Sequence, residues 1–211
     1  MENSVNIDIK TLRDRWKTPE GQELVRVLLD DNATKSDFDL AALKFYGPDL
    51  RYINSDTYTG TASCTDFRGV DLSKRDLRGQ GFGDDFSYAD FGGCILDGAN
   101  FFSCKLYYAN FQGTHAFEER VQFAPAYAQG ANFRNIRFKD ALLMNADFRG
   151  ADFSGAVFEK CDFSGALMQS AIFAGTQMFD CEAGSMHLSA KEKNAEWLVR
   201  ANFDQTFIRW E

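Results

Sequence analysis

The chain has 211 residues, of which 45% are apolar and 26% are charged, and its formal net charge is −8. A chain of this length suits one folded domain with a substantial core, and this apolar content excludes intrinsic disorder. The acidic balance argues against general binding to nucleic acid or anionic membranes, because both need clustered Lys and Arg.

The first element in chain order is an expected N-terminal helical cap over residues 1–33. Asp8 is placed to cap a short helix, and Thr18-Pro19 is placed to open a second one. Such helices would cover the first edge of the domain and block edge-to-edge aggregation. The start of the chain is charged where a secretory signal needs an apolar segment, so we expect a cytoplasmic protein.

Residues 34–64 carry no clear pattern and permit two interpretations. Phe45 and Leu50 are five residues apart and could belong to an irregular first coil of the repeat that follows. The alternative is an irregular connection, because residues 54–63 have the composition of a loop.

From Thr65 to Ile208 the sequence repeats every five residues. A small residue, a polar residue that is usually Asp or Asn, and a large apolar residue recur in that order. A period of five fits neither a helix nor a strand and indicates a repeat architecture. If the chain turns once per repeat, the small and the large apolar residues point inward. The aromatic side chains expected in this core include Phe133, Phe138, Phe148, Phe153, Phe158, Phe163 and Phe173.

These repeats resemble the pentapeptide repeat family, whose pattern A(D/N)(L/F)xx is matched by ADFRG at 146–150 and ADFSG at 151–155. The resemblance implies an all-β solenoid, a right-handed quadrilateral β-helix with four pentapeptides per coil, over residues 65–211. It also implies no catalytic motif, since the repeat residues are structural. Positions 20 apart should then stack at a strand spacing of ~4.8 Å.

Three irregularities interrupt the count. Phe82 to Phe86 is a step of four, and the 22 residues from Phe111 to Phe133 predict a bulge over 114–122. A helix is expected at 190–199, because strict counting would bury Lys193, and the repeat would resume at 201–205. A harmless corner insertion is the favoured interpretation of the bulge, and a binding loop is the alternative, because recognition often resides in a loop on a rigid scaffold. The candidate contacts in the bulge are His115, Phe117, Glu118, Glu119 and Arg120.

The sequence favours neither an enzyme nor a metal or cofactor site. The only two histidines, His115 and His187, have no partner arrangement for catalysis, and no phosphate-binding or dinucleotide-binding fingerprint occurs. Four cysteines, Cys94, Cys104, Cys161 and Cys181, occupy small inward positions and lack metal-ligand spacing. We expect them to be buried free thiols, with the last two stacked on consecutive coils and reduced.

The leading functional hypothesis is a non-catalytic protein-binding scaffold. Some members of the family that this chain resembles mimic a DNA duplex, bind type II topoisomerases such as gyrase or topoisomerase IV, and protect them from inhibitors. From Thr65 onward there are 20 acids and 15 bases, a net charge of −5, which supports that alternative only in part. A secreted effector is a further alternative, and no direct nucleic-acid or membrane partner is expected. The candidate acidic contacts form two groups, Asp162, Glu182 and Asp204, which are expected to line one face, and Asp71 and Asp90, which are also expected to share a face.

Overall fold

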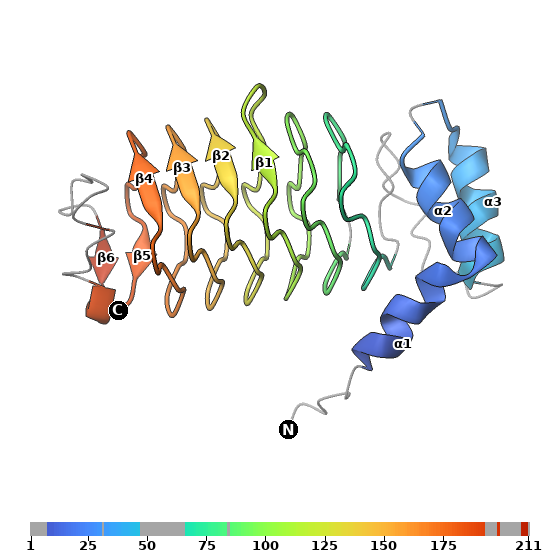
Figure 1. The fold of residues 1–211 in the computed structure, drawn as a ribbon, viewed down its shortest axis with the longest axis horizontal. Helices are drawn as coiled ribbons and strands as arrows, with labels where there is room; N and C mark the ends of the chain where they lie inside the picture. The colour runs from blue at the N-terminus through green and yellow to red at the C-terminus, as the bar shows by residue number, and fades with distance from the viewer. Residues whose placement is uncertain are drawn as a thin grey trace.

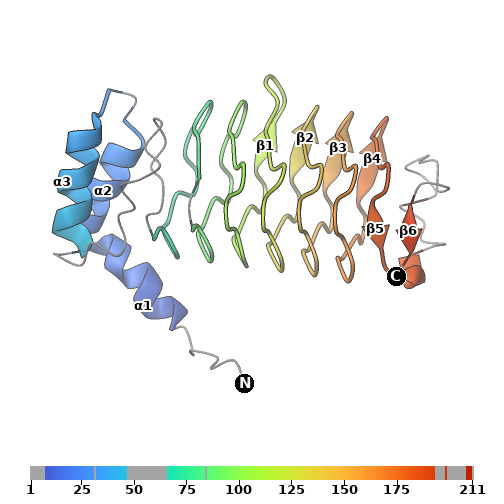
Figure 2. The same ribbon diagram turned by 180° about the vertical axis from the view of Figure 1, so that it is seen from behind.

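The computed structural model describes residues 8–30, 32–46, 66–83, 85–192, 198 and 208–210. Three helices stand at the N-terminal end of a rod of stacked coils (Figure 1). The reverse view in Figure 2 shows the same order, with the paired strands β5 (His187–Leu188) and β6 (Arg209–Trp210) at the far end. None of the helices among these residues has the length and apolar character needed to span a membrane.

Successive coils pair in parallel on four sides, as the resemblance to pentapeptide repeats implies. On one side β1 (His115–Ala116), β2 (Arg137–Lys139), β3 (Val157–Glu159) and β4 (Gln177–Phe179) form a four-stranded parallel sheet in that order. We call this side the β1–β4 face. At the C-terminal end β5 (His187–Leu188) pairs in parallel with β6 (Arg209–Trp210).

The spacing between paired residues explains the irregular counts. Most bridges join residues 20 apart, such as Asp162 and Glu182. Asp66 pairs with Asp85, 19 residues on, so the step of four shortens one coil by a residue. His115 pairs with Arg137, 22 residues on, so the bulge adds two residues to its coil.

The polar residue of each repeat closes a corner of the coil. The Asp162 carboxylate accepts the backbone N–H of Ser164 at 2.8 Å, and Asp152 accepts that of Ser154 at 2.8 Å. Many corners then carry a residue in the left-handed region, such as Gly165 with a φ of +70°, where glycine has no steric penalty. The preference for Asp or Asn therefore has a local backbone cause.

The core is a stack of the large apolar residues at the repeat centres. Phe153 lies between two parallel rings, with centroid distances of 5.1 Å to Phe133 and 5.7 Å to Phe173. Phe138 contacts Phe158 edge to face in the next column. The inward prediction is confirmed for all seven aromatic centres, because Phe148 and Phe163 are buried as well.

The prediction that all four inward cysteines are buried is wrong at one position. Cys94, Cys104 and Cys161 are fully buried, whereas Cys181 is partly exposed. The packing is thinner toward the C-terminal end of the rod, where Ala183 is 9% exposed although the inward alanines at mid-rod are fully buried.

The N-terminal segment is helical. α1 (Ile9–Asp14) is capped by Asp8, which accepts the backbone N–H of Lys10, and the 3-10 turn η1 (Arg15–Lys17) follows. α2 (Pro19–Leu28) begins after Thr18, whose side chain accepts the backbone N–H of Gly21 at 3.1 Å. Both helices therefore start where the sequence places them.

α3 (Lys35–Tyr46) occupies the first part of the segment that the sequence left open. The interpretation of Phe45 as part of a first coil is wrong, because Phe45 lies in this helix and stacks on Trp16 with a centroid distance of 4.6 Å. Leu50 and the rest of residues 47–64 lie outside the described residues.

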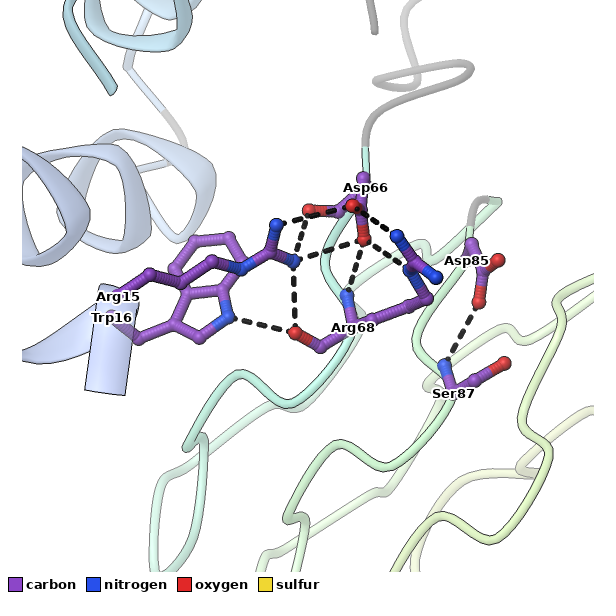
Figure 3. A network of polar contacts seen from close by, with 6 residues as sticks. All are labelled: Arg15, Trp16, Asp66, Arg68, Asp85 and Ser87. Atoms are coloured by element: carbon purple, nitrogen blue, oxygen red, sulfur yellow. Dashed lines mark hydrogen bonds and ion pairs between the residues drawn. The ribbon is translucent and has the colours of Figure 1, made fainter. Parts of the chain in front are cut away.

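Side chains of η1 bind the edge of the first coil (Figure 3). Within the rod, a backbone carbonyl accepts an N–H from the preceding coil, as Ser87 does from Gly69. In the first coil, Arg15 instead donates to the carbonyl of Asp66 at 3.0 Å, and the indole N–H of Trp16 donates to the carbonyl of Arg68 at 2.9 Å. These bonds satisfy acceptors that would otherwise face an open edge.

The Asp66 carboxylate holds this junction together. It lies between Arg68 and Arg15, at 2.8 Å and 2.9 Å. Burial alone would raise the pKa of Asp66, but the hydrogen bonds from the two guanidinium groups hold it well below its usual range. The carboxylate therefore stays ionised in the folded protein at neutral pH.

The helix expected at 190–199 is described at residues 190–192 and at Leu198. Ala190–Glu192 form a 3-10 turn, and Leu198 is helical and buried. The remaining positions of that prediction, and the resumed repeat at 201–205, lie outside the described residues.

Candidate functional site

The chain leaves the regular rod most clearly at the corner after β1, where a loop rises above the neighbouring corners (Figure 1). All four residues from Phe117 to Arg120 are exposed. On either side, Ala116 and Val121 are fully buried, and so is Thr114. The bulge predicted over 114–122 is therefore too wide, because its ends belong to the regular coil. We call residues 117–120 the corner loop.

A carboxylate from the coil beneath holds the corner loop. Asp97 Oδ1 accepts the backbone N–H groups of Phe117 at 2.6 Å, Glu118 at 2.5 Å and Glu119 at 3.3 Å. Asp97 is only 5% exposed. The next residue, Gly98, has a φ of +71°, and a Cβ there would lie 2.6 Å from the Glu119 carboxylate. Because Gly98 has no side chain, the corner loop can lie against the coil beneath it.

The charge of Asp97 is stabilised by the loop that it holds. Burial alone would raise the pKa of Asp97, but the backbone N–H groups of Glu118, Phe117 and Glu119 together lower it below the ordinary value. Hydrogen bonds to an ionised acceptor are among the strong ones in proteins. The corner loop is therefore ordered by a local electrostatic contact.

We predict that Asp97→Ala releases the corner loop without unfolding the rod. Amide exchange at residues 117–119 should accelerate by roughly tenfold to a hundredfold, because a hydrogen bond to a charged group contributes ~1.5 to 3 kcal/mol. Glu159→Ala, at an exposed corner position of β3, is the matched control and should leave the loop unchanged. Unaltered exchange in Asp97→Ala would remove the anchoring role.

The same contact gives a pH dependence with a defined sign. The pKa of Asp97 is lowered in the folded protein, so its stabilisation of the loop is complete above the unfolded value of ~3.9. It is lost as the pH falls below that value through the lower folded pKa. Loop amide shifts in an NMR titration should follow this transition, and Asp97→Ala should lack it.

Phe117 gives the corner loop an exposed aromatic group. Its side chain is 50% exposed, and its ring stacks on the half-buried His115 of β1 at 5.4 Å. Glu118, Glu119 and Arg120 surround it with charge and are themselves exposed. The structure thus brings all five predicted bulge residues together at one corner.

The predicted acidic contacts do not gather on one surface. Asp162 pairs with Glu182 on the side that follows the β1–β4 face along the chain. Asp71 pairs with Asp90 on a different side, which also carries Asn110. Asp204 lies outside the described residues. The acids therefore form two separate short columns.

Arginines accompany many of the other repeat acids. Asp76 pairs with Arg78 at 2.5 Å, and Asp147 pairs with Arg149 at 2.6 Å. On the Asp71 side the chain places amides between acids, and the side chain of Asn110 donates to Asp90 at 2.8 Å. The rod therefore presents mixed charge over much of its described length.

The sequence analysis did not predict that Asp97 anchors the corner loop. Asp97-Gly98 occupies an ordinary corner position, and Phe117 follows Asp97 by 20 residues, the length of one coil. That spacing is the only signal that could have placed the carboxylate beneath the loop. The candidate site gains Asp97 and Gly98 as supporting residues.

The described residues contain no cluster of three or more His, Cys, Asp or Glu side chains that could hold a metal ion. His115 lies in β1 and His187 in β5, which belong to different sheets. The arrangement of the corner loop offers an aromatic contact with a charged rim, which suits binding.

Comparisons with known proteins agree with the repeat. The family model described as pentapeptide repeats matches in eight copies over residues 85–115, 122–159 and 146–181. The matches stop at 115 and resume at 122, on either side of the corner loop. A search of curated proteins found no match.

Several solved structures are similar over part of the chain. A trypsin-treated variant of QnrB1, a plasmid-mediated fluoroquinolone resistance protein, is 20% identical with a TM-score of 0.46, covering 68% of this chain and 66% of that one. A pentapeptide repeat protein from the Arabidopsis thaliana thylakoid lumen is 30% identical with a TM-score of 0.18, covering 50% and 62%. Rfr23 from the cyanobacterium Cyanothece 51142 is 14% identical with a TM-score of 0.22, covering 67% and 91%. The chain thus spans less than two thirds of the Arabidopsis protein and about two thirds of this QnrB1 variant chain.

Proposed function

Because the repeats of this chain belong to the pentapeptide repeat family, we propose that it is a non-catalytic, cytoplasmic scaffold that binds another protein through the corner loop. The observation that carries this proposal is the anchoring of the loop by three N–H bonds to the buried Asp97. A loop that is already ordered loses little conformational entropy on binding, so its contacts contribute more fully to affinity.

The side chains of the corner loop define the partner surface. Phe117 is the natural anchor, because binding energy at protein interfaces concentrates in aromatic groups that enter a pocket on the partner. Glu118 and Glu119 flank it with two negative charges. We therefore propose an apolar pocket rimmed by Lys or Arg as the complementary surface on the partner.

A DNA-mimicking protein that binds gyrase or topoisomerase IV is the second candidate. The adjacent carboxylates of Asp162 and Glu182 favour it. Against it, a duplex 30 Å long carries on the order of 18 phosphate charges, at one per ~1.7 Å. The ion pairs of Asp76 and Asp147 with arginine bring the negative charge density of the rod further below that of a duplex.

Two variants separate the candidates in one capture experiment. In the first, Phe117–Arg120 are replaced by Asp-Gly, which copies the corner at Asp97-Gly98 one coil earlier and restores a coil of regular length. In the second, Asp162→Asn is combined with Glu182→Gln. Tagged proteins are used to capture partners from lysate, and the affinity of each specific partner is then measured with purified components.

We predict that the loop replacement weakens partner binding by roughly 30-fold or more, the equivalent of ~2 kcal/mol for an interface hot spot. The acidic double variant should bind as the parent does, because outward charges are screened and only modest contributors. A partner lost with the acidic variant and retained with the loop replacement would contradict the proposal. Protection of gyrase from a quinolone in a supercoiling assay, dependent on Asp162 and Glu182, would favour the DNA mimic.

A further inference from the structure

Two cysteines occupy equivalent places in consecutive coils near the C-terminal end of the rod. Cys161 and Cys181 are 20 residues apart, and the backbone N–H of Glu182 donates to the carbonyl of Cys161 at 2.9 Å. Their thiols point the same way, because each lies near a carbonyl of the coil before it, Phe138 at 3.5 Å and Phe158 at 3.7 Å. Cys161 and Cys181 are therefore neighbours on consecutive coils of the rod.

The backbone spacing suits a disulfide. Neighbouring positions in a β-ladder have Cα atoms ~4.8 Å apart, within the ~4.4 to 6.8 Å range of disulfides. Bond formation would also require the two Cβ atoms to approach to ~3.5 to 4.5 Å. Cys94 and Cys104 cannot do the same, because they are ten residues apart on opposite sides of one coil. Among the four inward cysteines, Cys161 and Cys181 are thus the pair that stacks on consecutive coils.

The two thiols differ in access. Cys181 is partly exposed, whereas Cys161 is fully buried. A hydrogen bond from Cys161 lowers the pKa of Cys181, while the neighbouring thiol and burial raise the pKa of Cys161. Cys181 is therefore the thiol that ionises first and the more accessible of the two.

We propose that Cys161 and Cys181 are a reversible dithiol–disulfide site that reacts with small disulfides such as oxidised glutathione. The Cys181 thiolate attacks one sulfur of oxidised glutathione, forming a mixed disulfide and releasing one glutathione thiolate. Cys161 then loses its proton and attacks the Cys181 sulfur, and the second glutathione leaves as its thiolate. The protein loses two electrons and two protons, and oxidised glutathione becomes two molecules of glutathione.

The link would join two coils at the end of the rod. Contacts in a solenoid are made mainly with the neighbouring coil, so its ends open most easily. A covalent bond between consecutive coils would restrain that opening. The expectation that this pair stays reduced depended on burial of both thiols, and the exposure of Cys181 removes that protection. The corner loop is separate from this site, so either proposal can fail alone.

The test uses the full-length reduced protein equilibrated with oxidised glutathione. Free thiols are then alkylated, and the protein is cut with trypsin. Cleavage after Lys160 and Lys191 gives one peptide, 161–191, whose only cysteines are Cys161 and Cys181. The proposal predicts a peptide that has lost two hydrogen atoms, carries no alkyl group or glutathione, and recovers both thiols on reduction.

Alanine variants separate the two roles. Ala141 holds the same position one coil earlier, so Cys161→Ala and Cys181→Ala should be accommodated. Cys161→Ala should retain glutathione on Cys181, because the resolving thiol is gone, and Cys181→Ala should gain no adduct. The proposal is overturned if the parent peptide remains fully alkylated on both cysteines, or if the parent keeps glutathione on Cys181 without forming the link.

Discussion

Replacing Phe153 with alanine is expected to lower the free energy of unfolding by about 3 to 5 kcal/mol. The ring is 1% exposed and lies between Phe133 and Phe173 in the central aromatic column. Its removal leaves a cavity and breaks two stacking contacts, each of which adds ~0.5 to 1.5 kcal/mol beyond burial. Equilibrium denaturation with urea, compared with the parent, measures the loss.

Phe179→Ala is the matched control for this experiment. Phe179 lies in β4, but its side chain is 50% exposed and points away from the column. Its replacement should change the free energy of unfolding by no more than about 0.5 kcal/mol. Equal stability of the Phe153→Ala protein and the parent would show that the inward register is wrong.

Replacing Trp16 with alanine is expected to have an effect of similar size, about 3 to 5 kcal/mol. The indole is 2% exposed, stacks on Phe45 and on Phe67 of the first coil, and donates its N–H to the Arg68 carbonyl. Its loss removes this packing and one of the two donors to a carbonyl at the edge of the rod, to which Arg15 also donates at 2.9 Å. Thermal unfolding should shift to lower temperature.

Exposure of that edge also predicts self-association, because an open strand edge is a template for pairing with another chain. Light scattering of Trp16→Ala should rise with protein concentration below its unfolding transition. Arg13→Ala changes an exposed side chain in α1 and serves as the control. If Trp16→Ala unfolded with the same midpoint as Arg13→Ala, the helices would not be holding the first coil.

The repeat region was predictable because each five-residue unit carries its own inward pair. Ala151 and Phe153 are both buried, and the same holds for Ala146 and Phe148. The packing of each coil therefore follows from local sequence. The five-residue count alone locates the coil near Phe82 that is one residue shorter than the others. α3 was not predictable in this way, because its apolar residues show little helical periodicity and Phe45 packs on Trp16, which lies 29 residues away in the sequence.

The candidate site was predictable in position and not in detail. The 22-residue step located the insertion, yet it could not show that Thr114 and Val121 keep inward positions. The role of Asp97 depends on which residue lies one coil above it, and that is a property of the stacked rod. The placement of Asp71 and Asp162 on different sides of the rod likewise follows from how the coils stack.

Hydrogen exchange of the protein with and without its captured partner shows whether the partner binds at the corner loop, because it maps the contact surface on the rod. We expect new protection within residues 115–121, centred on Phe117, and unchanged exchange around Asp162 and Glu182. The complex of the variant that carries Asp-Gly in place of Phe117–Arg120 should not form under the same conditions. Protection confined to the amides around Asp162 and Glu182, with none in the corner loop, would contradict the account.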